Sequence, residues 1–304
     1  MMIAPEGSGQ SAAPLPEQVG AYRVDSLIGE GAAAIVYRAH PTAAAAGDTP
    51  QTVALKVLKP EAMTQPQVLA CFQFEARVLS RLDHRGILRV YDAGVDDDRM
   101  YTAMELLDGV SLDNVLIANK RLTPAQSVDI ARQVADALDY LHRSGYVHRD
   151  VKPANLMLTP QGRVALFDFG TVVRIQDGAP YEAGLYGTPA FLAPEQTVAG
   201  GKVDGRADLY AAGIMLYLMV AGRKPFYGSR SEVLTAHVNA TPPRPSQFAR
   251  ISPALEAVIL KSIAKSPDDR YQSGAEMAQA LATLPSLVPP SLGERLRGWL
   301  RRGA

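Results

Sequence analysis

Ile28-Gly-Glu-Gly-Ala-Ala-Ala-Ile-Val-Tyr-Arg-Ala39 (IGEGAAAIVYRA) is the stretch from which the fold can be argued. Two glycines, Gly29 and Gly31, are followed by Ala34 where a third glycine would complete G-x-G-x-x-G. A dinucleotide-binding turn tolerates alanine there, but it needs a helix directly afterwards and an acidic residue about 20 positions further on. Asp48 lies near that spacing. The stretch predicts a phosphate-binding loop, and its surroundings must decide which kind.

The residues after the loop favour a strand over a helix. Residues 35–39 (IVYRA) are rich in branched and aromatic side chains, and Pro41 would end any helix that began at the three alanines. Asp48 lies in a Gly-Asp-Thr-Pro turn, away from any expected strand end. We therefore expect a β-hairpin over nucleotide phosphates, and not a doubly wound dinucleotide-binding fold.

The composition is that of an ordinary globular chain with ample core. The chain has 304 residues, 47% of them hydrophobic, and its 31 basic and 31 acidic residues give a formal net charge of zero. Without a basic field, we expect no nucleic-acid partner. The single cysteine, Cys71, excludes an intramolecular disulfide, and no Cys/His cluster has zinc-ligand spacing. A reducing compartment, the cytoplasm, is the expected location.

The ends of the chain differ from its middle. Residues 1–21 contain no Lys or Arg and no apolar run, which predicts a disordered polar leader and not a targeting signal. The longest apolar run, 209–221, is shorter than the ~20 residues of a membrane-spanning helix, so we expect a buried core helix and no transmembrane segment. Residues 285–304 are a proline-containing linker and a basic amphipathic tail. Residues 292–302 of this tail could contact an anionic membrane surface, bind a partner, or dock on their own domain.

Two regions of different pattern lie between these ends. Short segments rich in branched and aromatic residues predict strands at 22–28, 35–39, 53–59, 87–92 and 100–106, with one helix at 71–82. Beyond residue 107 the pattern is mostly helical, as at 123–142, where Thr123 and Pro124 form a helix-start signal. We expect an α+β chain with a small β-rich lobe, a larger α-helical lobe, and a ligand cleft near the connector 104–109.

Five further motifs follow the glycine-rich loop. They are Val53-Ala-Leu-Lys56, Glu75 in the predicted helix, His148-Arg-Asp-Val-Lys-Pro-Ala-Asn155, Asp168-Phe-Gly170 and Ala193-Pro-Glu195. In this order they resemble the protein-kinase catalytic domain over roughly residues 22–284. The stretches GTPAFLAPEQ and DLYAAG are similar to those of bacterial Ser/Thr kinases of the eukaryotic type. The resemblance implies a bilobal protein-kinase fold with an N-lobe at 22–106 and a C-lobe at 107–284.

The resemblance implies that charged residues hold ATP and Mg²⁺. Lys56 would reach the α- and β-phosphates and would be held by an ion pair with Glu75. Asp168 would chelate Mg²⁺, and Asn155 would supply a neutral oxygen to a second metal ion. Taken alone, Lys56 would more often be an exposed strand lysine, so the argument depends on the whole set.

The resemblance also implies an acceptor site and an adenine pocket. Asp150 would be the catalytic base for the acceptor hydroxyl, and Lys152 is the residue that Ser/Thr-specific members carry two positions later. The adenine pocket would be lined by Leu27, Val36, Ala54, Met104 and Met157, with backbone hydrogen bonds from Glu105 and Leu107. The implied function is that of an ATP-dependent protein Ser/Thr kinase. The alternative is a pseudokinase-like nucleotide-binding scaffold, which the intact charged set disfavours.

Two further pairings are implied as architecture. Glu195 would pair with Arg270 in a buried bridge, and Asp208 would anchor the catalytic loop from the start of the apolar helix. A homodimer through the small lobe is a further partner that the resemblance suggests.

The segment after Asp168-Phe-Gly170 departs from the family pattern. Arg149 precedes the catalytic Asp, and kinases with this arginine usually depend on a phosphorylated activation loop. Thr171 is the one Ser or Thr between Gly170 and Gly187, and Thr188 matches the substrate-binding threonine. We therefore expect activation by a route other than phosphorylation of a loop threonine.

Overall fold

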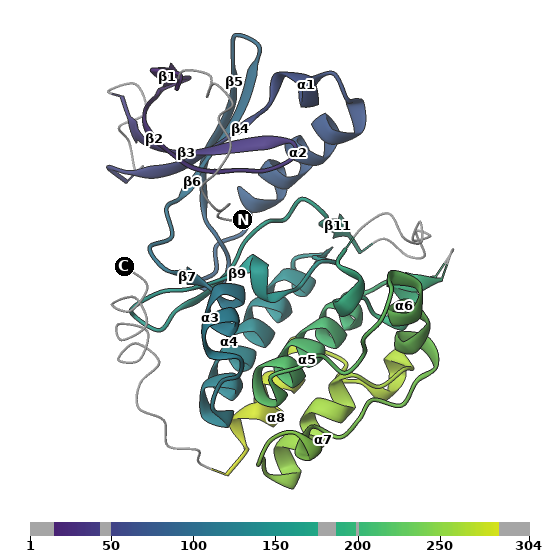
Figure 1. Cartoon of the computed structure of the whole chain (residues 1–304). Helices are drawn as coiled ribbons and strands as arrows, with labels where there is room; N and C mark the ends of the chain where they lie inside the picture. The colour runs from purple at the N-terminus through teal and green to yellow at the C-terminus, as the bar shows by residue number, and fades with distance from the viewer. Residues whose placement is uncertain (1–14, 43–49, 176–186, 199–200, 286–304) are drawn as a thin grey trace. The chain divides into compact units, whose positions relative to one another are not determined.

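The computed structural model describes residues 15–42, 50–175, 187–198 and 201–285. The backbone divides into two compact units, residues 1–83 with 88–108 and residues 84–87 with 109–304. Figure 1 shows that the first is a β-sheet with helices and that the second is mainly helical. The prediction of a small β-rich lobe and a larger helical lobe is confirmed. Asp48 and the tail at 292–302 lie outside the described residues.

The small unit is built on one antiparallel sheet with the strand order β1-β2-β3-β4-β6-β5. Its strands are β1 Gln18–Val19, β2 Tyr22–Glu30, β3 Ala34–Pro41, β4 Val53–Leu58, β5 Val90–Asp96 and β6 Arg99–Glu105, and its helices are α1 Pro60–Met63 and α2 Pro66–Leu79. All predicted strands are present. The helix predicted at 71–82 starts earlier, at Pro66, and ends earlier, at Leu79.

In the small unit, one strand starts three residues later than predicted, and one strand was not predicted. Strand β5 begins at Val90 and not at residue 87. Ile87 instead forms a β-bridge with Leu166, and both of these residues belong to the larger unit. Strand β1 comes from the end of the predicted leader, and Val19 within it is fully buried. Ordered structure therefore begins before residue 22, whereas residues 1–14 lie outside the described part of the chain.

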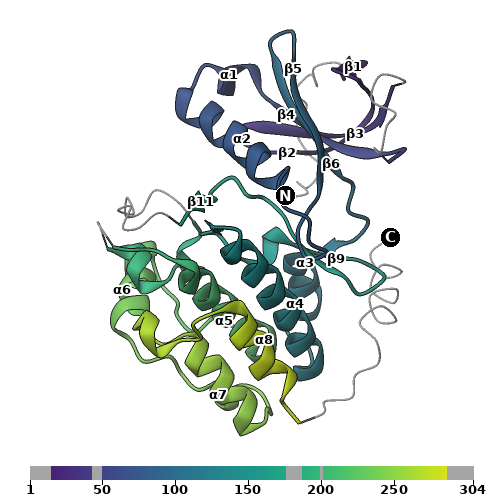
Figure 2. The same ribbon diagram turned by 180° about the vertical axis from the view of Figure 1, so that it is seen from behind.

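Alternation along the strands separates the two faces of this sheet. Tyr37, Val53, Leu55 and Val57 belong to one buried apolar cluster together with Tyr101. Since successive strand residues point to opposite faces, the residues between them lie on the other face. Helix α2 contributes Phe72 to a second cluster with Leu58 and Ala62. Figure 2 shows α2 beside the sheet.

The larger unit is a set of packed helices with short strands. Its helices are α3 Leu112–Asn119, α4 Pro124–Arg143, α5 Gly205–Ala221, α6 Arg230–Asn239, α7 Pro253–Ser262 and α8 Gly274–Ala282. Its strands are β7 Val110–Ser111, β8 Tyr146–Val147, β9 Leu156–Leu158, β10 Val164–Leu166 and β11 Val173–Arg174. Single 3₁₀ turns occur at η2 Pro153–Asn155, η3 Pro189–Phe191, η4 Pro194–Thr197, η5 Pro245–Gln247 and η6 Pro267–Asp269.

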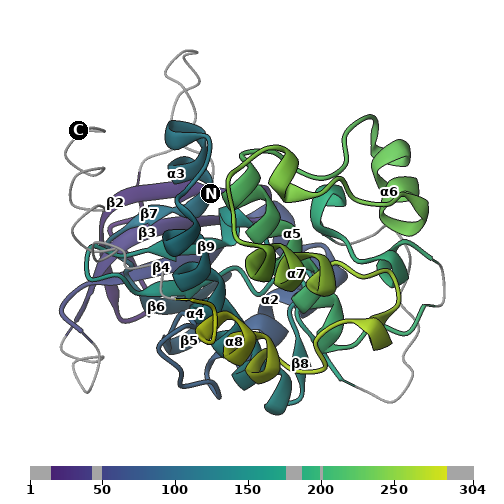
Figure 3. The same ribbon diagram turned by 90° about the horizontal axis from the view of Figure 1, so that it is seen from below.

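The core of this unit lies around α5. Helix α5 packs against α4 and α7, and α8 packs against both of these (Figure 3). Nearly every α5 side chain is buried, which confirms the predicted core helix at 209–221. Its first turn begins four residues before that range, capped by the Asp204 side chain on the Arg206 amide. Among the described residues, no helix combines the length and the apolar character needed to cross a bilayer.

Helix α4 starts as the sequence predicts. Thr123 is its N-cap, and the Thr123 and Gln126 side chains cap each other's backbone amides. Such reciprocal capping satisfies two backbone donors that would otherwise have no partner. At the far end of α4, the His142 ring is hydrogen-bonded to the Asp208 carboxylate on α5.

Candidate active site

The small unit contains the predicted ion pair. The Lys56 ammonium on β4 lies 2.7 Å from the Glu75 carboxylate on α2, and the side chains are only 20% and 10% exposed. The Lys56 ammonium also lies 5.7 Å from the centre of the Phe72 ring. A central strand and a packed helix thus hold the ammonium group in one place.

Strand register brings several predicted adenine-pocket residues onto the same face as Lys56. Val36 on β3 is directly opposite Lys56, and Met104 on β6 is directly opposite Ala54. Ala54 and Lys56 are two residues apart on β4, so all four side chains lie on the face opposite the Tyr37 cluster. Leu27 lies on β2 and is half exposed, Glu105 ends β6, and Leu107 follows in the connector.

Met157, the remaining predicted adenine-pocket residue, belongs to the larger unit. It lies on β9 and pairs with Ser111 on one side and Ala165 on the other. The register within the small unit therefore does not involve it.

The glycine-rich loop is a strand–turn–strand hairpin. Gly29 is opposite Val36 across β2 and β3, and the Gly31 amide donates to the Ala34 carbonyl at 2.8 Å. The Ala34 methyl packs against the cluster that contains Phe72. Because a strand follows the loop, a dinucleotide-binding turn with its helix is excluded.

The larger unit contains a hydrogen-bonded cluster around Asp150. One carboxylate oxygen accepts from the Thr188 amide at 3.0 Å and from the Thr188 hydroxyl at 3.1 Å. The other accepts from the Lys152 ammonium at 2.5 Å and from the Asn155 amide at 3.3 Å. Lys152 also donates to the Thr188 hydroxyl at 3.0 Å. The cluster brings together a carboxylate, an ammonium and a hydroxyl in one arrangement.

A buried carboxylate anchors the backbone that carries Asp150. Asp208 on α5 accepts from the amides of His148 and Arg149, both at 2.8 Å, and from the His142 ring at 2.8 Å. Burial alone would raise the pKa of Asp208, but these hydrogen bonds and the charge on His142 outweigh it and hold the pKa below its ordinary value. The predicted anchor is confirmed, and Asp208 is ionised at neutral pH.

His142 is a hydrogen-bond partner of Asp208 that was not predicted from the sequence. It lies in the last turn of α4, and its partner Asp208 lies far along the chain on α5. The available signal was its place at a helix end shortly before the catalytic loop, which alone does not distinguish it from an exposed helix histidine.

Asn155 and Asp168 are the candidate metal ligands. Asn155 is 2% exposed, and its amide nitrogen donates to the Asp150 carbonyl at 2.9 Å, so its amide oxygen is the atom that could serve as a metal ligand. Asp168 is exposed, has a left-handed φ of 63°, and makes no ion pair with any described residue. Such a conformation costs about 1–3 kcal/mol, and residues that adopt it cluster at active sites, although Asp97 and Lys120 have positive φ as well.

The donor set of these two residues fits Mg²⁺. This ion prefers oxygen ligands and is usually held by one or two carboxylates together with substrate phosphates. Within the described ranges, no group of three or more His, Cys, Asp or Glu converges, so a cage made wholly of protein carboxylates and imidazoles is not formed there. Phe169, directly after Asp168, is fully buried against His148 and fixes the start of this segment.

The segment after Gly170 is hydrogen-bonded to the loop that contains His148 and Arg149. The Arg149 guanidinium donates to the Thr171 carbonyl at 2.7 Å, and the Thr171 hydroxyl donates to the His148 carbonyl at 2.8 Å. Glu195 and Arg270 form the predicted pair, and the structure shows that it is bidentate, at 2.7 and 2.8 Å.

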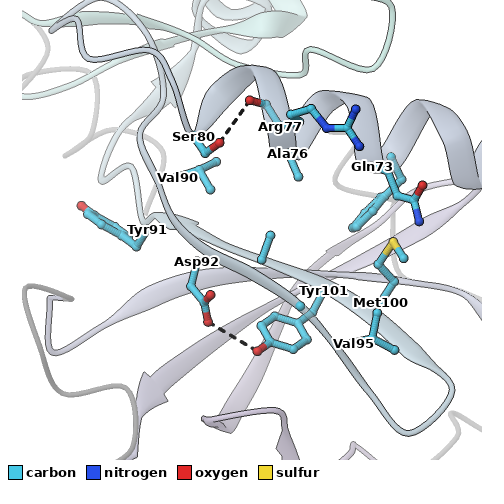
Figure 4. A pocket seen from close by; sticks show the side chains of 13 residues that line it. Gln73, Ala76, Arg77, Ser80, Val90, Tyr91, Asp92, Val95, Met100 and Tyr101 are labelled. Atoms are coloured by element: carbon cyan, nitrogen blue, oxygen red, sulfur yellow. Dashed lines mark hydrogen bonds between the residues drawn. The ribbon is translucent and has the colours of Figure 1, made fainter.

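A cavity of about 480 Å³ in the small unit contains none of the predicted site residues. It lies between α2 and strands β5 and β6, lined by Gln73, Arg77, Asp92 and Tyr101 among others (Figure 4). The predicted site is therefore defined by side-chain chemistry, and not by this cavity.

Comparisons with known proteins agree with this geometry. Residues 22–283 match the family model described as the protein kinase domain. The chain is 39% identical over 267 residues to a probable serine/threonine-protein kinase of Streptomyces coelicolor, covering 85% of this chain and 39% of the relative. It is 37% identical over 246 residues to the serine/threonine-protein kinase PknB of Mycobacterium leprae, covering 78% of this chain and 39% of the relative.

A solved structure has the same fold. The Mycobacterium tuberculosis PknI kinase domain superimposes with a TM-score of 0.67 at 32% identity, over 87% of this chain and 96% of that one. The chain spans about 39% of the length of the two curated relatives. The order of the motifs, the fold and the family match all agree, and this chain belongs to the protein kinase family.

Proposed function

We propose that this chain transfers the γ-phosphoryl group of ATP to Ser or Thr hydroxyls of proteins. The observation that carries the proposal is the cluster of Asp150, Lys152 and Thr188. A Ser or Thr hydroxyl beside this cluster would meet a carboxylate that can take its proton. It would also meet an ammonium that offsets the negative charge developing on its oxygen.

Each residue of the cluster has a distinct part in this mechanism. Thr188 donates twice to one oxygen of Asp150 and so fixes the plane of that carboxylate. Lys152 touches both the carboxylate and the threonine hydroxyl, so it would position the acceptor oxygen. Positioning of this kind supplies much of the rate of phosphoryl transfer, because the loose transition state needs little covalent assistance.

The remaining charged residues would hold ATP and its metal ion. Lys56, oriented by Glu75, would neutralise phosphate oxygens, and Asn155 and Asp168 would hold Mg²⁺. When bound, Mg²⁺ supplies charge neutralisation of the β- and γ-phosphates. The pseudokinase-like scaffold is disfavoured because Lys56, Asp150, Asn155 and Asp168 are all present.

The deciding experiment measures phosphate transfer from ATP to a generic protein acceptor with Mg²⁺ present. The wild-type chain is compared with Lys56→Met and Asp150→Asn. We expect transfer by the wild type and strong loss in both variants. Wild-type transfer no higher than that of the variants would reject the kinase activity and leave nucleotide-dependent scaffolding.

Ala34→Gly is expected to raise the apparent KM for ATP by a factor of about 2–5. Glycine makes the loop more flexible, and ordering it costs about 0.5–1 kcal/mol more than ordering alanine. The lost methyl also removes packing against the Phe72 cluster. Steady-state kinetics at varied ATP concentration measures the effect. Complete loss of activity would show that this hairpin is not the phosphate loop.

Phosphate at Thr171 or Thr188 is not expected to be required for activity. The Thr171 hydroxyl donates to the His148 carbonyl, and the Thr188 hydroxyl donates to Asp150, so both are already engaged. Mass spectrometry of the active, autophosphorylated protein tests this. Stoichiometric phosphate at either residue, together with loss of activity on its removal by a phosphatase, contradicts the prediction.

A further inference from the structure

Phe191 lies one 3₁₀ turn after Thr188, which belongs to the hydrogen-bonded cluster around Asp150. The 3₁₀ turn η3 begins directly after Thr188, and the Phe191 amide donates to the Thr188 carbonyl at 2.9 Å. A 3₁₀ turn rises about 2.0 Å per residue, so Phe191 lies about 6 Å along the chain from Thr188. Thr188 is itself bonded to Asp150. A peptide whose acceptor hydroxyl reached Asp150 would therefore pass close to η3.

Lys224 holds a positive charge at this place. Its ammonium lies 5.7 Å from the centre of the Phe191 ring, within the range of a cation–π contact. Its backbone is fixed on both sides, because Gly222 ends α5 with a left-handed φ of 72° and the Lys224 amide donates to the Tyr227 hydroxyl at 2.9 Å. Lys224 as a whole residue is half-buried.

Within the part of the chain that the structure describes, the positive charge beside Phe191 is not balanced by an ion pair. The described residues offer no carboxylate within ion-pair distance of Lys224 or of its neighbour Arg223, which instead lies 4.5 Å from the centre of the Phe248 ring. Acidic residues in the same region already have basic partners.

These pairs are Asp150 with Lys152, Glu195 with Arg270, and Asp204 with Arg206. The Lys224 ammonium beside η3 is therefore a positive charge whose complementary group is not supplied by the described chain, and Arg223 is the next basic residue along the sequence.

We propose that Lys224, supported by Arg223, selects protein substrates that carry an acidic side chain within a few residues of the acceptor Ser or Thr. The inference rests on the proposed kinase function and adds a substrate class to it. A carboxylate of the substrate would pair with the Lys224 ammonium as the acceptor hydroxyl meets Asp150. A complementary charge of this kind contributes to specificity more than to overall affinity.

The test uses the full chain with ATP, Mg²⁺ and a series of neutral peptides that each contain one threonine. Glutamate replaces glutamine in turn at each position up to about four residues on either side, because an extended peptide advances about 3.3 Å per residue. The readout is the ratio of kcat/KM for the glutamate peptide to kcat/KM for the glutamine peptide. This ratio is compared among the wild type, Lys224→Gln, Lys224→Glu and the control Arg250→Gln, which removes an exposed charge elsewhere in the larger unit.

We expect a ratio of about 3 to 5 at one or two positions for the wild type, as for a partly exposed ion pair, and a smaller ratio at high salt. Lys224→Gln should bring the ratio close to 1, Lys224→Glu should favour a lysine peptide at the same position, and Arg250→Gln should keep the wild-type ratio. A wild-type ratio of 1 at every position, or a preference that survives in Lys224→Gln, overturns the inference and leaves the kinase activity intact. Absence of transfer to any peptide or protein, equal to that of Asp150→Asn, rejects the proposed function itself.

Discussion

Asp150→Asn is expected to lower kcat for protein phosphorylation by about 10²–10⁴-fold, the usual contribution of a positioned general base. Asparagine cannot take the acceptor proton. It also replaces one of two hydrogen-bond-accepting oxygens by a donor. In the native cluster one oxygen receives two hydrogen bonds from Thr188, and the other receives Lys152 and Asn155. Whichever way the amide turns, its NH₂ group faces donors.

The effect should appear in kcat and not in ATP binding. The Lys56–Glu75 pair belongs to the small unit, whereas Asp150 belongs to the larger one. We therefore expect the Kd of a nucleotide analogue to change less than about threefold, within the few tenths of a kcal/mol by which distant sites usually interact. Titration calorimetry or analogue fluorescence measures it beside the kinetics.

Asp136→Asn is the matched control for this experiment. Asp136 lies on α4 with a 47% exposed side chain, and its ion pair with Arg132 spans 3.6 Å. The same chemical change there should leave kcat within a factor of two, since exposed pairs contribute little. If Asp150→Asn retained more than a tenth of the wild-type kcat, or if the control fell equally, Asp150 would not be the base.

The predictable parts of this chain are those with strong local signals. The capping residues at Thr123 and the long apolar run of α5 locate two central helices to within a few residues. The motif order predicts Asp150 and Lys152, and the family resemblance predicts Asp208, before any coordinates are known. Their individual hydrogen bonds could not be predicted from the sequence. Hydrogen bonds such as that from Lys152 to Thr188 join residues that are far apart along the chain, and only the structure shows them.

The unpredicted parts depend on tertiary contacts. A two-residue strand such as β1 is too short to show any periodicity, and it is stable only because it pairs with β2 and buries Val19. Proline is common in the first turn of a helix, so Pro66 was a local signal for the early start of α2. The prediction instead placed the start where the helical spacing of apolar residues begins, at residue 71. The cation–π contact of Lys224 with Phe191 gives no sequence signal, because its partners lie in different loops.

Glu195→Gln is expected to lower the free energy of unfolding of the larger unit by about 3–5 kcal/mol, the cost of leaving a buried charge without its partner. The Arg270 side chain is completely buried. Its guanidinium donates to both Glu195 oxygens and to the carbonyls of Ala264, Arg206 and Lys265, so all five N–H groups are used. Glutamine has nearly the same shape, but it removes the only negative charge in this set of partners.

The matched control is Glu276→Gln, which breaks the exposed pair with Lys261, where the side chains are 43% and 42% exposed. This substitution should cost less than about 1 kcal/mol. Hydrogen exchange of peptides from α5 and α7 reports the larger unit directly, because exchange measures opening region by region. Protection of these helices should fall strongly in Glu195→Gln and little in the control. Equal losses would mean that Arg270 relaxes toward water when its partner is removed, and that the bridge does not hold the larger unit together.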